Sequence, residues 1–278
     1  DLGRVLNALA NDFDMKLSTL SGGLKDNAIP TDAEAVVIFS DTDMSDISTP
    51  GHADIPANSA HASLQDLISK WNQIIRHECT HTDPDICITL EPVDLPAATM
   101  ADTSTHTVID VLMAYPNGVR KMSKDIAGLV QTSLNLGILS TIKPDDQSTN
   151  GMVSFKSSVR SSIGSEKDAL LNSLKSLATL AGGTLTVTGD YPAWEYREDS
   201  PLRDLMVKIF KQQYGKEPVI QALHAGVECG IFASKLPGLD CVSFGPDMDD
   251  IHTTNESMNV ESVRRTWEYT LEILKELK

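Results

Sequence analysis

Residues 77–81 read His-Glu-Cys-Thr-His and match the pattern H-E-x-x-H. In zinc proteases this spacing places two imidazoles on one helix face, where they bind zinc, and the glutamate activates a water molecule. The helix expected over residues 63–76 has its apolar stripe centred near Trp71, so His77 falls well off the buried face. We therefore expect an exposed, frayed helix end, and a zinc protease that uses His77, Glu78 and His81 remains an alternative.

A second candidate is His52, which is followed by Asp54 and Pro56. In paired-zinc hydrolases an aspartate at this spacing orients a histidine ligand. Such sites need several further carboxylates, including a Glu-Glu pair, and this chain has no Glu-Glu dipeptide. We therefore expect a loop in which Asp54 stabilises a turn.

The third candidate lies near the carboxyl end of the chain, where polar residues follow apolar segments. Gly226 follows a predicted strand and would let the backbone approach a ligand closely. His252 lies in a polar loop, and Glu256 comes just before the last predicted helix. Open α/β sheets place their sites in loops beyond the strand ends. On spacing alone, a solvated side chain explains His252 better than a ligand role does.

Apolar periodicity predicts the order α-β-β-α-β twice, over residues 2–90 and 105–188. In the first copy we expect helices over 2–13 and 63–76 and strands over 15–20, 35–39 and 86–90. In the second copy we expect helices over 105–114 and 165–181 and strands over 129–140, 152–161 and 184–188. Each copy has the size of a small sheet covered by two helices on one face.

The last third of the chain alternates helices and strands. We expect helices over 201–214, 227–235 and 257–278, the first capped by Ser200, and strands over 218–223 and 241–244. This alternation is typical of a parallel α/β sheet. The strands are few for a complete layer, so the segment looks like part of a larger sheet.

The length, charge and cysteine content of the chain exclude several classes of protein function. The 278 residues suit one large or two ordinary domains, and a hydrophobic content of 41% supports a folded core. With 39 acidic and 23 basic residues the net charge is -16, which argues against binding to nucleic acids and anionic membranes. The 4 cysteines include no C-x-x-C pair, which indicates reduced thiols in a cytoplasm rather than a disulfide scaffold.

The carboxyl-terminal segment closely resembles a known enzyme family. From His224 onward, the pairs Gly-Pro at 245–246 and Asn-Glu at 255–256 and the triplet Asp-Ile-His at 250–252 are similar to the aminoacyl-histidine (Xaa-His) dipeptidases. These enzymes belong to the two-zinc aminopeptidase-like group. Four short segments resemble the lid domain of that family, at residues 21–23, 27–30, 158–161 and 191–194. The resemblance covers essentially the whole chain.

The resemblance implies an α/β fold, with a lid and dimerisation domain over residues 1–189 and the carboxyl-terminal part of a catalytic domain over 190–278. It also implies a cytoplasmic homodimer, a dipeptide substrate such as carnosine, and two zinc ions per subunit in the complete enzyme. His252 matches the family's last zinc ligand. Arg160 matches a lid-strand arginine that binds the substrate carboxylate, and Asn27 and Gly226 match positions near the substrate.

Most metal ligands and the general base of this family precede the lid. The resemblance therefore implies an amino-terminally truncated fragment that contains no catalytic residue, is inactive alone and does not hold zinc tightly. A non-catalytic binding or dimerisation module remains a further alternative.

Overall fold

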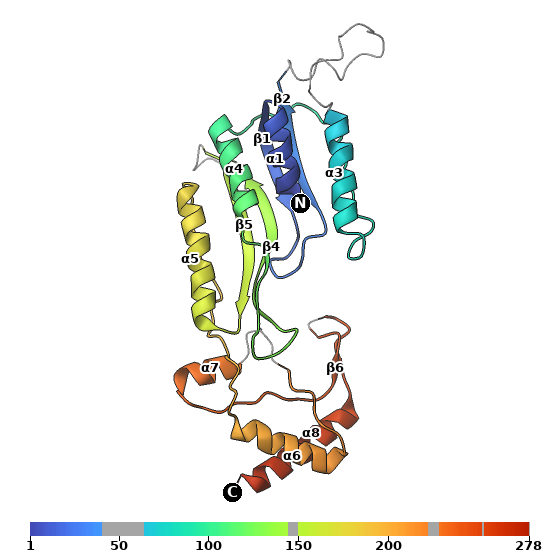
Figure 1. The fold of residues 1–278 in the computed structure, drawn as a ribbon, viewed down its shortest axis with the longest axis vertical. Coiled ribbons are helices and arrows are strands. Elements are labelled where there is room, and N and C mark those ends of the chain that lie inside the picture. The colour runs from blue at the N-terminus through green and yellow to red at the C-terminus, as the bar shows by residue number, and fades with distance from the viewer. Residues whose placement is uncertain (41–63, 144–149, 222–227, 252, 278) are drawn as a thin grey trace. The chain divides into compact units, whose positions relative to one another are not determined.

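The computed structural model describes residues 1–40, 64–143, 150–221, 228–251 and 253–277 (Figure 1). Its contacts divide the chain into two compact units. The first unit contains residues 1–118, 134–158 and 172–185, and the second contains 119–133, 159–171 and 186–278. No described helix combines the length and the apolar character needed to cross a membrane.

One sheet of five strands contributes to both units. Its strands are β1 (Met15–Gly22), β2 (Ala33–Phe39), β3 (Gly118–Met122), β4 (Val130–Ile142) and β5 (Met152–Ser161). The order is β2-β1-β4-β3, and β5 also pairs with β4. β1 runs antiparallel to β2 along its length and meets β4 only at Ser21 and Gly22. The long strand β4 therefore joins the β1–β2 pair to β3 and β5.

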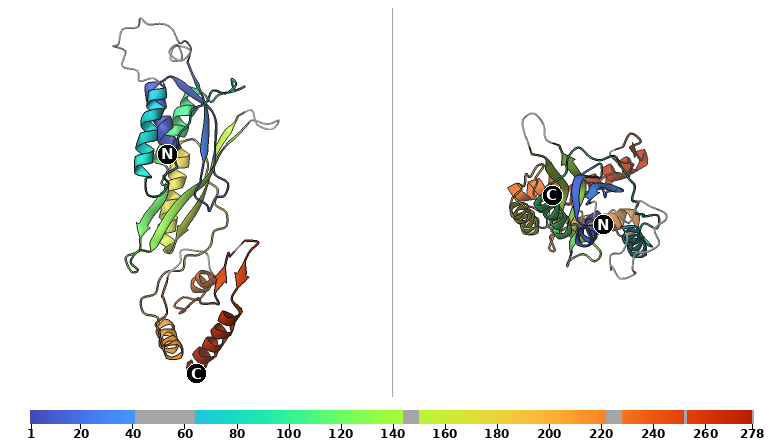
Figure 2. Two further views of the ribbon diagram at one scale, coloured as in Figure 1. Left: turned by 90° about the vertical axis from the view of Figure 1, so that its right-hand side faces the viewer. Right: turned by 90° about the horizontal axis from the view of Figure 1, so that it is seen from above.

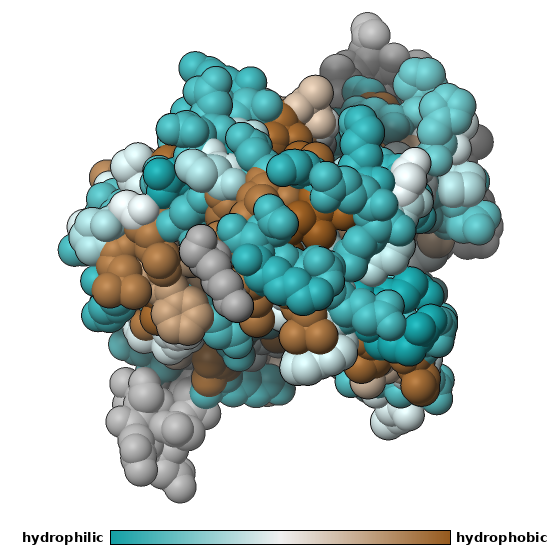
Figure 3. Space-filling view, turned by 90° about the horizontal axis from the view of Figure 1, so that it is seen from below, coloured by the Kyte–Doolittle hydropathy of each residue, from teal (hydrophilic) through white to brown (hydrophobic). Residues whose placement is uncertain are grey.

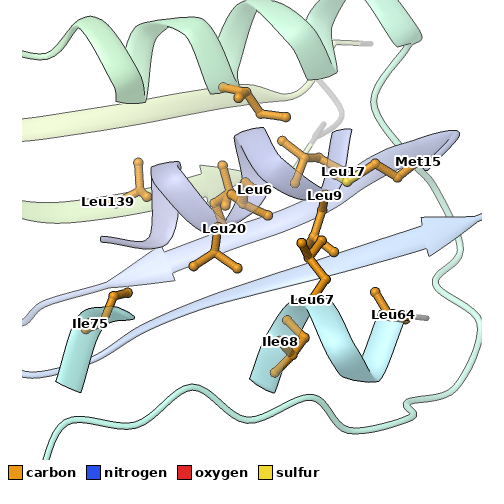
Figure 4. Packing of buried hydrophobic residues seen from close by; sticks show 12 residues of the cluster. Leu6, Leu9, Met15, Leu17, Leu20, Leu64, Leu67, Ile68, Ile75 and Leu139 are labelled. Carbon is orange, nitrogen blue, oxygen red and sulfur yellow. The ribbon is translucent and has the colours of Figure 1, made fainter. Parts of the chain in front are cut away.

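Helices of the first unit cover one face of this sheet (Figure 2). They are α1 (Leu2–Asp12), α3 (Leu64–Glu78) and α4 (Asp102–Ala114). α1 buries Val5, Leu6 and Leu9, whose spacing of three or four residues places them on one helix face. They pack with Leu17 and Leu20 of β1 and with α3 (Figure 4). This cluster is the core of the first unit.

A β-bulge in β1 attaches α4 to the sheet. The register between β1 and β2 shifts between Leu17 and Thr19, which leaves Ser18 as the extra residue. The Leu17 N–H then donates to the buried Thr105 Oγ1 at 3.2 Å, and the Leu17 carbonyl accepts from Met100 N at 2.7 Å. The Ser18 hydroxyl donates to the Ala98 carbonyl at 2.7 Å. The segment leading into α4 thus forms hydrogen bonds with both backbone groups of Leu17, next to the bulge, and with the Ser18 side chain.

The α/β class is confirmed, but two predicted strands of the repeat are not formed. Residues 86–90 run beside α3, where Asn72 Nδ2 donates to the Ile88 carbonyl at 2.5 Å and Asn72 Oδ1 accepts from Ile88 N at 2.7 Å. A side-chain amide therefore replaces the neighbouring strand. Residues 184–188 form no strand, and β3 is a strand that the sequence pattern did not predict.

The second unit contains α6 (Pro201–Tyr214), α7 (Glu228–Lys235), α8 (Val260–Glu276) and the hairpin β6 (Met248–Asp249) and β7 (Ser257–Met258). α5 (Gly164–Leu180) belongs to both units. The core between α6 and α8 is small and consists of Met206, Ile209, Tyr269 and Ile273. The Tyr269 hydroxyl donates to the Met206 carbonyl at 2.7 Å.

The strands predicted over 218–223 and 241–244 are wrong for the described residues of these ranges, which form no strand. A strand forms only when a neighbouring strand satisfies its N–H and C=O groups, and the described part of the second unit offers none to these segments.

α8 also exposes a second apolar stripe opposite Tyr269 and Ile273, with Trp267 62% exposed at its centre. The stripe consists of Val260, Val263, Trp267, Leu271 and Leu274. Apolar side chains likewise reach the surface in the view of Figure 3.

Asp240 attaches the amino end of α6 to the segment that follows α7. The Ser200 hydroxyl accepts from Arg203 N at 3.2 Å, which caps the helix, and donates to Asp240 Oδ1 at 2.6 Å. Asp240 Oδ2 accepts from Leu202 N at 2.8 Å. Partial burial by itself raises the pKa of Asp240, but these hydrogen bonds and the nearby arginines outweigh it and hold that pKa below its ordinary value of 3.8.

We expect Thr105→Val to destabilise the first unit by about 1–3 kcal/mol, because the buried Leu17 N–H would lose its acceptor. Urea unfolding followed by tryptophan fluorescence, to which Trp71 of the first unit contributes, measures this loss. Thr103→Val, at an exposed position of the same helix, is the matched control and should leave the transition unchanged. Equal effects of the two variants would contradict the assigned role of Thr105.

We expect the Asp240 clamp to weaken in acid. Because the folded state lowers the pKa of this carboxyl, its stabilising effect is complete well above 3.8 and is lost as the pH falls through the folded pKa. The urea midpoint of the second unit should therefore decrease between about pH 6 and about pH 3, and Asp240→Asn should remove part of that decrease. The exposed Asp249→Asn is the control, and an unchanged acid slope in Asp240→Asn would refute the clamp.

Candidate functional site

The H-E-x-x-H residues do not share a helix face. α3 ends at Glu78, and residues 79–82 form turns in which Thr82 N and Asp83 N both donate to the Cys79 carbonyl. His81 therefore lies outside the helix. The i, i+4 geometry that would aim two imidazoles at one metal is absent from this segment.

Glu78 forms an ion pair that ties α3 to α1. The Arg4 guanidinium donates to both carboxylate oxygens, at 2.6 and 2.9 Å, and lies 5.1 Å from the ring centroid of Trp71. The hydrogen bonds from Arg4 lower the pKa of Glu78, so the carboxylate is a poor general base. No cluster of three potential metal ligands occurs among the described residues. The zinc-protease alternative is therefore not favoured.

The His52 candidate lies outside the described residues, as do Gly226 and His252. The structure does describe Glu228, which follows the segment with Gly226, and the neighbours of His252 on both sides. α7 begins at Glu228, and its start is fixed by Gly230, where an added Cβ would lie 2.7 Å from the Pro192 carbonyl oxygen. Only glycine permits this close approach of the helix to residue 192.

The loop that contains His252 is carried by the β6–β7 hairpin. Asp250, at φ 51°, is in the left-handed region, and its carbonyl accepts from Thr253 N at 3.1 Å. Asp247 connects this hairpin to α8, because its N–H donates to Ser262 Oγ at 2.9 Å and its carboxylate pairs with Arg265 at 3.1 Å. The hairpin and the start of α8 thus form a defined base for the loop.

Asn27 lies on an exposed turn of the first unit that is attached to β4. Asn135 Nδ2 donates to the carbonyls of Asp26 and Ala28, at 3.0 and 2.7 Å, on either side of Asn27. Gly137 of β4 lies directly under the turn, because an added Cβ would lie 2.4 Å from the Lys25 carbonyl oxygen. The turn is held through its backbone, which leaves the Asn27 side chain in an exposed position.

Arg160 lies near the end of β5, in the second unit, and is half-buried. The adjacent Ser161 hydroxyl is 2.9 Å from Thr132 Oγ1, and Ser162 N donates to the Gln131 carbonyl at 3.0 Å, so β4 fixes this strand end. Within the described parts of the chain, Arg160 has no ion-pair partner. A partly desolvated guanidinium of this kind is suited to binding an external carboxylate.

Burial raises the pKa of the Cys229 thiol at the start of α7, and Cys241 raises it further. Sequence reasoning did not relate these two residues, because their spacing matches no cysteine motif.

Comparison with known proteins places this site in context. The profile of peptidase family M20/M25/M40 matches residues 18–276. The chain is 32% identical to the cytosol non-specific dipeptidase of Escherichia coli (strain K12), over 99% of this chain and 52% of that protein. A crystal structure of aminoacylhistidine dipeptidase from Vibrio alginolyticus superposes with a TM-score of 0.83 at 29% identity, covering 99% of this chain and 51% of that one.

The chain therefore spans about half the length of these relatives. The fold similarity extends over both units, and the family profile runs through β5, α7 and α8. The chain belongs to peptidase family M20/M25/M40.

Proposed function

We propose that this chain is the lid and carboxyl-terminal part of a metal-dependent dipeptidase that acts on Xaa-His dipeptides. The observation that carries the proposal is the match, along 99% of the chain, to two proteins whose names describe dipeptidases. Residues 1–189 would form the lid and dimerisation domain, and 190–278 would complete a catalytic domain. The name of the Escherichia coli relative supports a cytosolic location.

Arg160 is the proposed anchor for the carboxylate of the dipeptide. A planar guanidinium makes two parallel hydrogen bonds to a carboxylate, which fixes both the position and the direction of a short substrate. The half-buried position of Arg160 supports this role, because partial removal from water strengthens the interaction with an incoming anion. No carboxylate among the described residues forms an ion pair with the Arg160 guanidinium, which is therefore available to a substrate.

Asn27 and Gly226 are proposed to contact the substrate further from the carboxylate. The exposed amide of Asn27 can donate and accept hydrogen bonds, which suits a peptide or imidazole group. Gly226 would allow a backbone group to approach the substrate, since glycine has no Cβ.

His252 is the proposed metal ligand of this chain. The resident metal of the family would need about four donors for a stable zinc site, and no described cluster of three exists. The described residues therefore do not form a zinc site by themselves. The remaining ligands and the general base would come from the family segment beyond the half that this chain matches.

A homodimer through the lid is also proposed. β2 is an edge strand of the sheet, so its outer N–H and C=O groups are not used by the ladder within the described chain. Pairing of such edges, or packing of lid helices, would join two copies. Static light scattering at micromolar concentration tests this, and a monomer mass would count against it.

We expect the 278-residue chain alone to show no hydrolysis of β-alanyl-histidine, and the product of its full reading frame to hydrolyse it. Removal of the metal with a chelator should abolish that activity. An inactive reading-frame product that still binds the dipeptide would instead identify a non-catalytic module.

In the active protein, Arg160→Ala should raise KM for Xaa-His dipeptides about 100-fold, which corresponds to about 3 kcal/mol for two charge-assisted hydrogen bonds. Arg160→Lys should recover part of the loss. The dipeptide amide, which lacks the carboxylate, should respond little to either change. Arg120→Ala, at an exposed arginine of β3, is the matched control. Equal losses for the acid and the amide would exclude the anchoring role.

We expect the chelator-treated, zinc-reloaded 278-residue chain to retain almost no tightly bound zinc at neutral pH, because it provides a single proposed ligand. Zinc content by atomic absorption measures this, and His81→Ala should behave like the unmodified chain. One zinc per chain that disappears in His81→Ala would overturn the assignment.

A further inference from the structure

Residues 190–195 are attached to the first turns of α5 within the second unit. The Lys167 ammonium of α5 donates to Asp190 Oδ1 at 2.5 Å and to the Tyr191 carbonyl at 2.7 Å. The side chain of Lys167 is only 15% exposed, whereas that of Asp190 is 61% exposed. A lysine that loses most of its hydration needs close partners, so this contact differs from an ordinary surface ion pair.

A second side chain attaches the other end of the same segment. Glu195 Oε1 accepts a hydrogen bond from the N–H of Gly164, the first residue of α5, at 3.2 Å. The first N–H groups of a helix have no partner inside the helix, so Glu195 supplies one from outside. A carboxylate in this place also interacts favourably with the helix dipole.

The segment also contacts α7. As described above, Gly230 of α7 lies so close to the Pro192 carbonyl oxygen that an added Cβ would be 2.7 Å from it. Residues 190–195 therefore connect the start of α5 with the start of α7, and all of these contacts lie within one unit.

Arg160 lies just before the start of α5, at the end of β5. Ser161 holds the short connection, because its hydroxyl donates to the Ile163 carbonyl at 3.0 Å and accepts from Ile163 N at 3.1 Å. A movement of the first turn of α5 would therefore be transmitted to Arg160.

We propose that Lys167 and Glu195 are positioning residues that set the place of Arg160 relative to the carboxyl-terminal part of the second unit. This inference rests on the proposed function, in which Arg160 binds the substrate carboxylate and that part of the unit belongs to the catalytic domain. In a dipeptide, one α-amino acid separates the carboxylate from the bond that is cleaved. An anchor held at one distance therefore selects substrates of that length, and a displaced anchor misplaces the reacting bond.

The test uses the active product of the full reading frame and compares β-alanyl-histidine with β-alanyl-β-homohistidine. The second substrate carries its carboxylate one methylene further from the bond that is cleaved. We expect the unmodified enzyme to prefer the first substrate. Lys167→Met should lower kcat for it about 10-fold, change KM less than about 3-fold and reduce the preference between the two substrates about 10-fold. Lys167→Arg, which can keep both hydrogen bonds, should retain the preference.

Glu195 provides a second and independent pair of variants. Glu195→Ala should behave like Lys167→Met, whereas Glu195→Gln keeps an acceptor for Gly164 N and should resemble the unmodified enzyme. Lys175→Met, at an exposed position of α5, is the matched control and should leave the preference unchanged. A variant that merely loses stability lowers the rates for both substrates equally, so the ratio of the two rates separates positioning from folding.

An active unmodified enzyme, together with an unchanged substrate preference in Lys167→Met and Glu195→Ala, would overturn this inference and leave the proposed function intact. An unmodified enzyme that hydrolyses neither dipeptide would overturn the proposed function, and this inference with it. If Lys167→Met fails to fold, the comparison of Glu195→Ala with Glu195→Gln decides the question.

Discussion

The structure is governed by the requirement that extended backbone be paired. In the first unit this requirement is met inside the chain, even at irregular points. Next to the bulge at Ser18, the N–H and C=O groups of Leu17 bond to Thr105 and Met100. The backbone N–H of Ile88 donates to the Asn72 side chain. In the second unit, the described residues over 218–221 and 241–246 form no strand, and α8 exposes a second apolar stripe.

β4 links this framework to the proposed site. Near its middle, Asn135 and Gly137 hold the turn that presents Asn27. At its beginning, Gln131 and Thr132 hold the end of β5 that carries Arg160. A shift of the β4 register by one residue would turn these side chains to the opposite face and release both attachments. The positions of Asn27 and Arg160 therefore both depend on the register of β4, although neither residue lies on that strand.

Local physical rules explain which features were predictable. The Ser200 cap and the following proline determine the start of α6, and alternating side chains determine β5, so both were predicted closely. The segment over 86–90 has the composition of a strand, but its partner is the Asn72 side chain, which no periodicity reveals. The pairing of Glu78 with Arg4 is similarly remote in sequence. The prediction of Arg160 as a substrate-binding residue came from the family resemblance, because local pattern alone does not distinguish it from other arginines.

Two arginines show why context rather than residue type separates structural from functional groups. Arg4 forms an ion pair with Glu78 and lies over the ring of Trp71. These interactions hold α1 against α3. Arg160 is half-buried and has no counter-charge in the described chain. Partial desolvation of a charge is unfavourable unless an opposite charge compensates for it. Because no carboxylate within the described residues compensates Arg160, a bound carboxylate would do so, and the proposed role of this residue rests on that difference from Arg4.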